Sequence, residues 1–172
     1  MVIGIDIDST ITSTGKKTRE CLQEFAPGYE DYHLLPEEQY KQFLDLYEEY
    51  IHINCELKSG VQEAFAYFKE CGYKIVIITA RDTKHCPNQF AITTDYFKRH
   101  NLHYDEIIFE CEEKGQTASS HHVNLFIDDK EANLDDISAY GIECFRFGAA
   151  KDSKYKTFTN WYDIIEYLKD RG

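Results

Sequence analysis

Two aspartates, Asp6 and Asp8, directly follow a short apolar run near the start of the chain, Val2–Ile5. A short run with branched side chains is typical of a buried parallel strand. Ligands of open α/β sheets bind at the carboxyl ends of such strands. Two carboxylates buried side by side repel each other unless a metal ion or a cationic partner compensates their charge. This segment, which also carries the hydroxyl groups of Ser9 and Thr10, therefore predicts a site of chemistry.

Further polar side chains follow other apolar runs of the chain. They are Thr79 after the run 74–78, Lys114 in a charged loop, and Asp128 and Asp129 after the run 123–127. Four carboxylates in one pocket cannot all stay ionised near neutral pH with one lysine as their only compensation. Mg²⁺ binds a few carboxylates together with water and phosphate oxygens, so we expect Mg²⁺ as the cofactor. A carboxylate nucleophile, a second carboxylate, a hydroxyl group, a lysine and a metal predict phosphoryl transfer through an aspartyl-phosphate.

The order of these motifs resembles the haloacid dehalogenase superfamily of phosphatases. The resemblance covers most of the chain and rests on Asp6–Thr10, Thr79, Lys114 and Asp128–Asp129. It implies that Asp6 is the nucleophile and that Asp8 protonates the leaving oxygen and later takes a proton from water. It also implies that Thr79 binds a phosphoryl oxygen and that Lys114 neutralises charge on the nucleophile and the phosphoryl group.

The resemblance also implies how the metal is held. Asp6, the backbone carbonyl of Asp8, and Asp129 would be its ligands. Asp128 is either a further ligand or the partner that orients the site.

Four further residues are candidates for binding the substrate and its phosphate group: Ser9, Thr10, Ala80 and Arg81. For Arg81, an ion pair with Asp82 is an equally good interpretation. Lys130 is the alternative to Lys114, because both lysines lie in charged segments near predicted strand ends.

Within the superfamily, three features resemble the bacterial 5'(3')-deoxyribonucleotidase-like group. These are a long insertion after the first motif and the segments 78–81 and 126–130. The resemblance implies a nucleotidase for (deoxy)nucleoside monophosphates. Ser9 departs from the pattern, since many members have glycine there, and phosphoserine phosphatases are similar in carrying serine. A phosphatase for another small phosphomonoester, such as a sugar phosphate or a phosphoserine-like compound, is therefore the alternative.

Alternating strands and helices predict an α/β fold with a parallel sheet. The predicted strands are 2–5, 74–78, 106–109, 123–127 and 142–145. The predicted helices of the core are 59–71, beginning with a capping box of Ser59 and Gln62, then 88–100, 130–140 and 161–168, the last opened by Asn160. The resemblance implies a three-layer, Rossmann-like arrangement of about five strands in the order 5-4-1-2-3.

The connection between the first strand and the helix at 59 is far longer than an ordinary βα loop. It contains two predicted helices, Lys16–Phe25 and one that Pro36 opens. We interpret residues 14–55 as a helical cap inserted into a single-domain core of residues 1–13 and 56–172. Among the aromatic residues of this insertion, we expect Tyr40 and Tyr47 in its core. Three others are candidates for facing the pocket, namely Tyr29, Tyr32 and His33.

The composition limits the classes of partner. The chain has 172 residues and a net charge of −12, which disfavours a nucleic-acid polymer but allows a small phosphorylated metabolite. No stretch approaches the roughly 20 apolar residues of a membrane span, and no signal-peptide pattern is present. The cysteines are scattered along the chain, and we expect them to be reduced thiols. We therefore expect a cytoplasmic protein. The sequence does not indicate an oligomeric state.

A signalling module is the alternative from another class. Response-regulator receiver domains also combine an acidic pair, a phosphorylated aspartate, a threonine and a lysine on a parallel sheet. They place the acidic pair after the first strand, whereas this chain has Asp128 and Asp129 after the fourth. They also have no use for a cap, so the sequence favours an enzyme.

Overall fold

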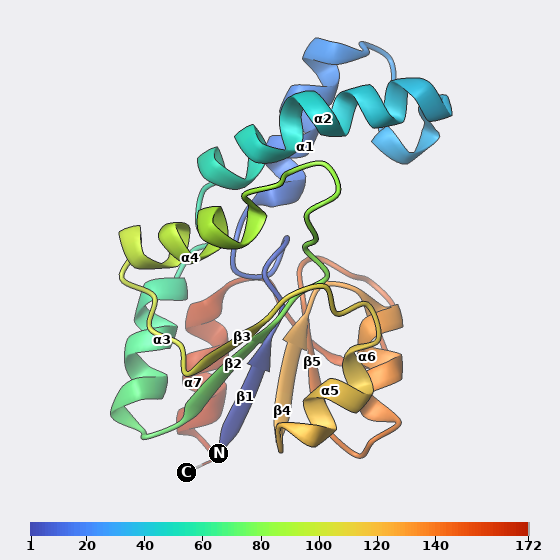
Figure 1. Cartoon of the computed structure of the whole chain (residues 1–172). Coiled ribbons are helices and arrows are strands. Elements are labelled where there is room, and N and C mark those ends of the chain that lie inside the picture. Colours follow the sequence, from blue (N-terminus) through green and yellow to red (C-terminus); the bar gives the residue numbers. More distant parts are fainter. Residues whose placement is uncertain (172) are drawn as a thin grey trace.

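A sheet of six parallel strands forms the centre of the computed structural model, which describes residues 1–171 (Figure 1). The strands are β1 (Val2–Ile5), β2 (Lys74–Ile78), β3 (Glu106–Ile108), β4 (Leu125–Asp128), β5 (Glu143–Phe147) and β6 (Lys156–Phe158). Their order is β3-β2-β1-β4-β5-β6. The predicted order of the first five strands is confirmed. The sequence pattern does not indicate β6, a three-residue edge strand beside β5.

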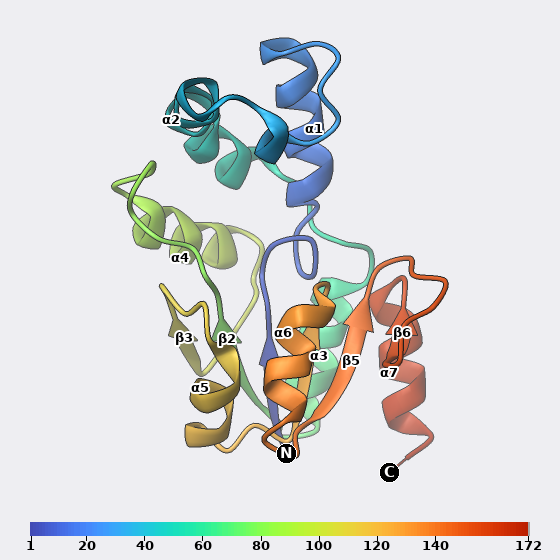
Figure 2. The same ribbon diagram turned by 90° about the vertical axis from the view of Figure 1, so that its right-hand side faces the viewer.

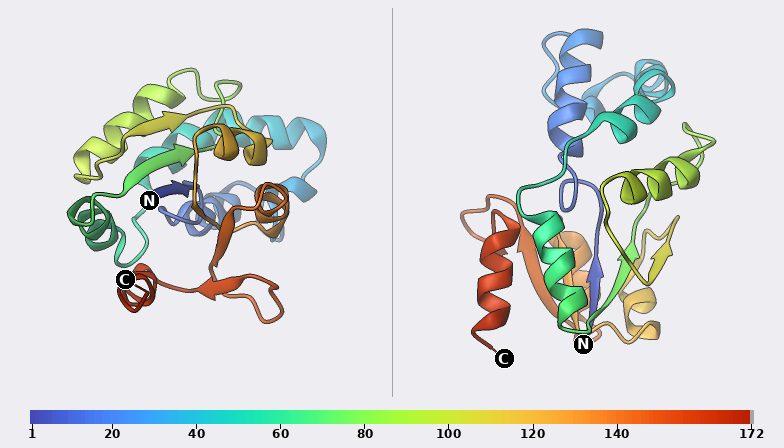
Figure 3. Two further views of the ribbon diagram at one scale, coloured as in Figure 1. Left: turned by 90° about the horizontal axis from the view of Figure 1, so that it is seen from below. Right: turned by 90° about the vertical axis from the view of Figure 1, so that its left-hand side faces the viewer.

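Helices cover both faces of the sheet, which gives the predicted three-layer α/β fold (Figure 3). They are α1 (Thr14–Phe25), α2 (Glu37–Asn54), α3 (Val61–Glu70), α4 (Gln89–Arg99), α5 (Lys114–Ser120), α6 (Glu131–Ser138) and α7 (Trp161–Lys169). Side chains of α3, α4 and α7 share one apolar cluster with the sheet. Those of α5 and α6 form a second cluster on the opposite face. None of the helices in the described part of the chain combines the length and apolar composition that crossing a bilayer requires.

The central strand β1 is packed from both sides. Ile3 and Ile5 are fully buried in the cluster with α3 and α7. Gly4 faces the other side, where a Cβ atom would lie 2.3 Å from the ring of Phe126 in β4. A glycine therefore stands in an otherwise branched strand because Phe126 occupies the space beside it.

The start of α3 differs from the predicted capping box. The residue before the helix is Gly60 with a left-handed φ of 83°, and no side chain caps the helix. The carbonyl of Ser59 accepts from the backbone N–H of Trp161, and the side chain of Gln62 donates to the carbonyl of His100. The capping-box prediction is therefore wrong, because Gly60 and not Ser59 directly precedes the helix and the Gln62 side chain contacts His100 instead. At α7, the Asn160 side chain accepts from the N–H at 163, as predicted.

A separate pair of helices, α1 and α2, stands beyond the carboxyl ends of the strands (Figures 1 and 2). The short 3-10 turn η1 (Tyr32–Leu34) lies between them. Their apolar residues form a cluster of their own: Cys21, Leu22, Leu35, Phe43 and Ile51. We call this unit, residues 14–54, the helical pair.

Candidate active site

Three carboxylates meet where β1 and β4 end. The backbone N–H of Asp6 bonds to the carbonyl of Ile127 at 3.0 Å, which extends the pairing of the two strands by one residue. Asp6 therefore lies beside Asp128, the last residue of β4. One oxygen from each of Asp6, Asp128 and Asp129 lies within 4.8 Å of the others. The structure thus brings together the acidic residues that the sequence pattern singles out.

Lys114 is buried between two of these carboxylates. Its Nζ lies 2.5 Å from Oδ1 of Asp6 and 2.8 Å from Oδ2 of Asp128, and only 2% of the residue is exposed. The expectation of a loop position is wrong, because Lys114 is the first residue of α5. The next residue, Gly115, lets α5 approach α6 closely, since a Cβ atom there would lie 2.6 Å from the carbonyl oxygen of Asp136. This contact fixes the end of α5 that carries Lys114.

The alternative lysine, Lys130, lies elsewhere. Its side chain is exposed at the rim of the cavity and makes no ion pair or hydrogen bond within residues 1–171. Lys114 is therefore the lysine that contacts the carboxylates.

The two adjacent aspartates after β4 differ in their surroundings. Asp128 accepts from the backbone N–H of Lys130 at Oδ1 and from Lys114 and Asn133 at Oδ2. Oδ1 of Asp129 is buried and receives no hydrogen bond from any described residue. An unpaired buried carboxylate oxygen is costly, and a divalent cation would satisfy it. Asp129 thus fits a metal ligand, and Asp128 fits the residue that orients Lys114.

The charge balance supports a metal at this place. Burial raises the pKa of Asp6 to about 8, and the neighbouring carboxylates add to this while Lys114 opposes it. Burial and Asp128 raise the pKa of Asp129 to about 6. Since oxygen ligands without sulfur or imidazole suit hard cations, the residues fit Mg²⁺.

Asp8 forms an ion pair with Arg81 and is not one of the three clustered carboxylates. Arg81 donates from Nε to Oδ2 at 3.0 Å and from Nη2 to Oδ1 at 2.6 Å, and Thr14 donates to Oδ1 at 2.7 Å. Burial alone would raise the pKa of the Asp8 carboxyl, but the guanidinium group holds it well below its usual range. The alternative pairing of Arg81 with Asp82 is wrong, since the nearest cation to Asp82 is Lys84 at 3.8 Å.

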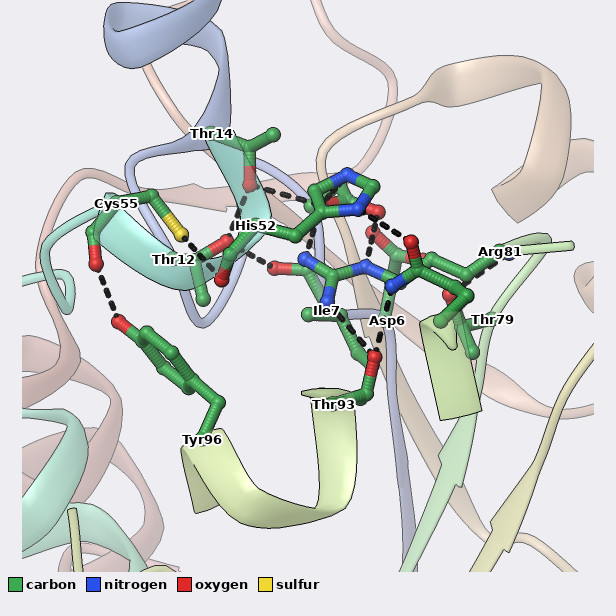
Figure 4. Close-up of polar contacts among 12 residues, drawn as sticks. Asp6, Ile7, Thr12, Thr14, His52, Cys55, Thr79, Arg81, Thr93 and Tyr96 are labelled. Atoms are coloured by element: carbon green, nitrogen blue, oxygen red, sulfur yellow. Dashed lines mark hydrogen bonds and ion pairs between the residues drawn. The ribbon is translucent and has the colours of Figure 1, made fainter. Parts of the chain in front are cut away.

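A buried polar network continues from Arg81 to the helical pair (Figure 4). Nη1 of Arg81 donates to Thr93 of α4, which also accepts from Gln89, and Gln89 contacts Nδ1 of His52 at 2.6 Å. Nε2 of His52, in the last turn of α2, lies 3.9 Å from Asp8. Burial lowers the pKa of His52 to about 4. Of these residues only Asp8 and Arg81 are candidates from the sequence; His52, Gln89 and Thr93 are not, although Gln89 and Thr93 are polar residues at helical spacing.

The remaining candidates for binding the phosphate differ in burial and in whether they line the cavity. Thr79 is fully buried and accepts from the N–H of Arg81 at 3.2 Å, so its own hydroxyl proton stays available. Ser9 and Ala80 line the cavity described below, whereas Thr10 is fully buried and does not line it. Ser9 has a left-handed φ of 63°, which explains physically why glycine suits this position.

A cavity of about 490 Å³ separates the ends of the strands from the helical pair. On the side of the sheet it is lined by residues that include Asp8, Ser9, Ala80, Arg81, Asp129 and Lys130. On the opposite side its lining includes Leu22, Tyr32, His33, Phe43, Leu44, Glu48 and His52. The prediction that Tyr32 and His33 face the pocket is confirmed. Tyr29 packs with Tyr40 and Tyr47 against the apolar cluster of the helical pair instead.

Solved structures share this fold. A haloacid dehalogenase-like family hydrolase from Streptococcus pneumoniae superimposes with a TM-score of 0.70 over 97% of each chain, at 14% sequence identity. The chain has the fold of the haloacid dehalogenase superfamily. A second hydrolase of this superfamily, from Geobacter sulfurreducens PCA, gives a TM-score of 0.68 over 98% of this chain and 96% of its own, at 11% identity.

A curated protein is also similar to this chain in sequence. The Bacillus subtilis (strain 168) protein named "Putative nucleotidase YqfW" is 26% identical over 185 residues, covering 98% of this chain and 93% of its own. No protein-family model matches the chain. The relatives confirm the resemblance to haloacid dehalogenase hydrolases that the motifs indicate, and they support the prediction of a phosphatase.

We expect the variant Asp129→Asn to be more stable than the wild type in EDTA, by an amount that grows with pH. The folded-state pKa of about 6 lies above the ordinary value of 3.8. The folded wild type therefore binds more protons than the unfolded chain between these values and loses stability as pH rises. The difference in free energy of unfolding between variant and wild type should grow by up to about 3 kcal/mol from pH 4 to pH 7.

Urea unfolding at several pH values measures this difference, and the contribution of His52, common to both proteins, cancels in it. Exposed Asp95 provides the matched control, because Asp95→Asn should show no such trend. A difference for Asp129→Asn that does not vary with pH would contradict the assigned electrostatics.

Proposed function

We propose that the protein is a Mg²⁺-dependent phosphomonoester hydrolase that acts through an aspartyl-phosphate on (deoxy)nucleoside monophosphates. The observation that carries the proposal is the position of Asp6. Its carboxylate lies at the end of the central strand, beside the buried ammonium group of Lys114 and close to Asp129, which would hold a cation together with it. A carboxylate held between two positive groups can approach an anionic phosphate.

In the first half of the reaction, an oxygen of Asp6 attacks phosphorus as the bond to the leaving oxygen breaks, and Asp8 supplies a proton to that oxygen. In the second half, water attacks phosphorus, Asp8 takes its proton, and the bond to Asp6 breaks to release inorganic phosphate. The ion pair with Arg81 keeps Asp8 ionised, which suits the second half. Donation of a proton in the first half requires Asp8 to separate from Arg81.

Asp6, Asp129 and the backbone carbonyl of Asp8 would hold the metal, while Asp128 orients Lys114. When bound, Mg²⁺ would offset the negative charge of the carboxylates and of the phosphoryl oxygens. The Thr79 hydroxyl donates to a phosphoryl oxygen, and Lys114 offsets the charge on Asp6 and the phosphoryl group.

The nucleotide part of the proposal is supported by the relative named as a nucleotidase and by the helical pair. We treat residues 14–55 as a cap, because this segment forms one wall of the cavity above the carboxylates. A small phosphorylated metabolite fits a cavity of about 490 Å³, whereas a polymer does not. A sugar phosphate or a phosphoserine-like compound is the alternative substrate.

Phosphate release from a panel of substrates tests the proposal. We expect hydrolysis of deoxynucleoside and nucleoside monophosphates with Mg²⁺, and loss of activity in EDTA that Mg²⁺ restores. Activity that ignores chelation would contradict the mechanism. A panel in which sugar phosphates or phosphoserine rank first would overturn the nucleotidase assignment and leave the mechanism intact.

A further inference from the structure

One carboxyl oxygen of Glu48, which lines the cavity, has no hydrogen-bond partner in the part of the chain that the structure describes. Its Oε2 atom is buried, and no described residue donates a hydrogen bond to it. Burial raises the pKa of this carboxyl group. The nearby imidazole of His85 makes no hydrogen bond to this oxygen, and its Nδ1 contacts Asp45 at 2.7 Å. A desolvated acceptor without a donor is costly, and a ligand that supplies a donor would remove that cost.

The position of Glu48 relative to the reacting groups follows from the helix that carries it. Leu44, Glu48 and His52 are four residues apart on α2, and all three line the cavity. His52 lies beside Asp8, the group that serves the leaving oxygen, at 3.9 Å. With a rise of about 1.5 Å per residue, Glu48 stands roughly 6 Å farther along the helix and Leu44 roughly 12 Å farther.

The cavity therefore changes in character with distance from Asp8. Charged groups lie at the strand ends, the Glu48 carboxylate lies one turn of α2 farther along, and the lining from the helical pair also includes apolar Leu22, Phe43 and Leu44 together with charged Arg19, Glu30 and Asp31. A 5'-nucleoside monophosphate carries groups that suit this lining: a phosphate, a sugar with hydroxyl donors, and a flat base with apolar faces.

We propose that Glu48 is a specificity-determining residue that accepts a hydrogen bond from the 3'-hydroxyl group of a nucleoside 5'-monophosphate. This inference rests on the proposed phosphatase function and assigns its substrate selectivity to one side chain of α2. Oε2 of Glu48 has no donor within residues 1–171, so the substrate hydroxyl would be its partner.

The test compares kcat/KM for a 2'-deoxynucleoside 5'-monophosphate, its 2',3'-dideoxy analogue and p-nitrophenyl phosphate, whose leaving group has no hydroxyl in that position. We expect the wild type to prefer the 3'-hydroxyl substrate by at least about tenfold. Glu48→Leu should lower kcat/KM for that substrate by about 10- to 100-fold. It should leave kcat/KM for p-nitrophenyl phosphate unchanged. Glu48→Gln keeps an acceptor and should retain part of the preference. The exposed neighbour Glu49 gives the control Glu49→Gln, which should change nothing.

A wild type without preference for the 3'-hydroxyl, or a preference that survives in Glu48→Leu, would overturn the inference. An equal loss on all three substrates would also overturn it, because it would indicate a structural role. Each of these results leaves the phosphatase proposal standing. A wild type that hydrolyses neither nucleotides nor p-nitrophenyl phosphate would instead refute the proposed function itself, and the inference with it.

Discussion

Replacing Asp6 with asparagine should lower kcat for phosphate release by at least about 1,000-fold, at saturating Mg²⁺ and for every substrate hydrolysed. The amide has nearly the same shape as the carboxylate but cannot attack phosphorus to form the acyl-phosphate. Lys114 and Asp128 would still contact each other, so the site should stay folded around the substitution. Initial rates of phosphate release measure the effect, with equilibrium binding of substrate as a check that the site remains competent.

The same variant should not lose stability. Asp6 is buried beside three other carboxylates, and their repulsion of its own charge disappears when that charge is removed. We therefore expect Asp6→Asn to unfold at the same or a higher temperature than the wild type in EDTA. Asp95→Asn, on the exposed side of α4, is the matched control and should leave both rate and stability unchanged. Residual activity within tenfold of the wild type would exclude Asp6 as the nucleophile.

The meeting of the acidic residues could be predicted because it depends on local patterns and one topological rule. Each apolar run is short, and polar residues stand at its carboxyl end. Parallel strands place these ends at one edge of the sheet, so Asp6 and Asp129 approach each other although more than a hundred residues separate them.

The environment of Lys114 could not be predicted in this way. The helix that it begins, Lys114–Ser120, has seven residues and almost no apolar periodicity. A lysine at a helix N-terminus is also unfavourable for the helix dipole. Contacts across the fold stabilise this helix start, namely those of Lys114 with the two carboxylates and of Gly115 with Asp136. Sequence spacing does not contain them.

Sequence patterns do not indicate His52 and Thr93, which lie in the network behind Asp8, for a related reason. The network members His52, Arg81 and Thr93 come from α2, from the segment after β2, and from α4. Their contacts depend on how the helical pair and α4 sit above the sheet, and a single sequence does not specify that arrangement. The adjacent Asp82 was an obvious local partner for Arg81, yet burial favours a fully paired guanidinium, and Asp8 provides two oxygens for it.

Replacing Lys114 with methionine should have the second-largest effect. The substitution removes the buried cation between Asp6 and Asp128 and keeps a side chain of similar length. Breaking a buried ion pair from one side costs about 3–5 kcal/mol, because the remaining charges are uncompensated. In EDTA at pH 8 we expect a loss of about 3 kcal/mol in the free energy of unfolding. The loss should shrink toward pH 5, since Asp6, whose pKa is already raised to about 8, then takes up a proton.

Catalysis should also suffer, with kcat lowered by about 100- to 1,000-fold, because no other side chain would offset charge on Asp6 and the phosphoryl group. Lys130→Met is the matched control: the side chain is exposed, and its loss should change stability by less than about 0.5 kcal/mol. Added Mg²⁺ should restore part of the stability of Lys114→Met, since a cation bound at Asp129 and Asp6 compensates the same carboxylates. If Lys130→Met abolished activity while Lys114→Met kept it, Lys130 would be the lysine that serves the phosphoryl group.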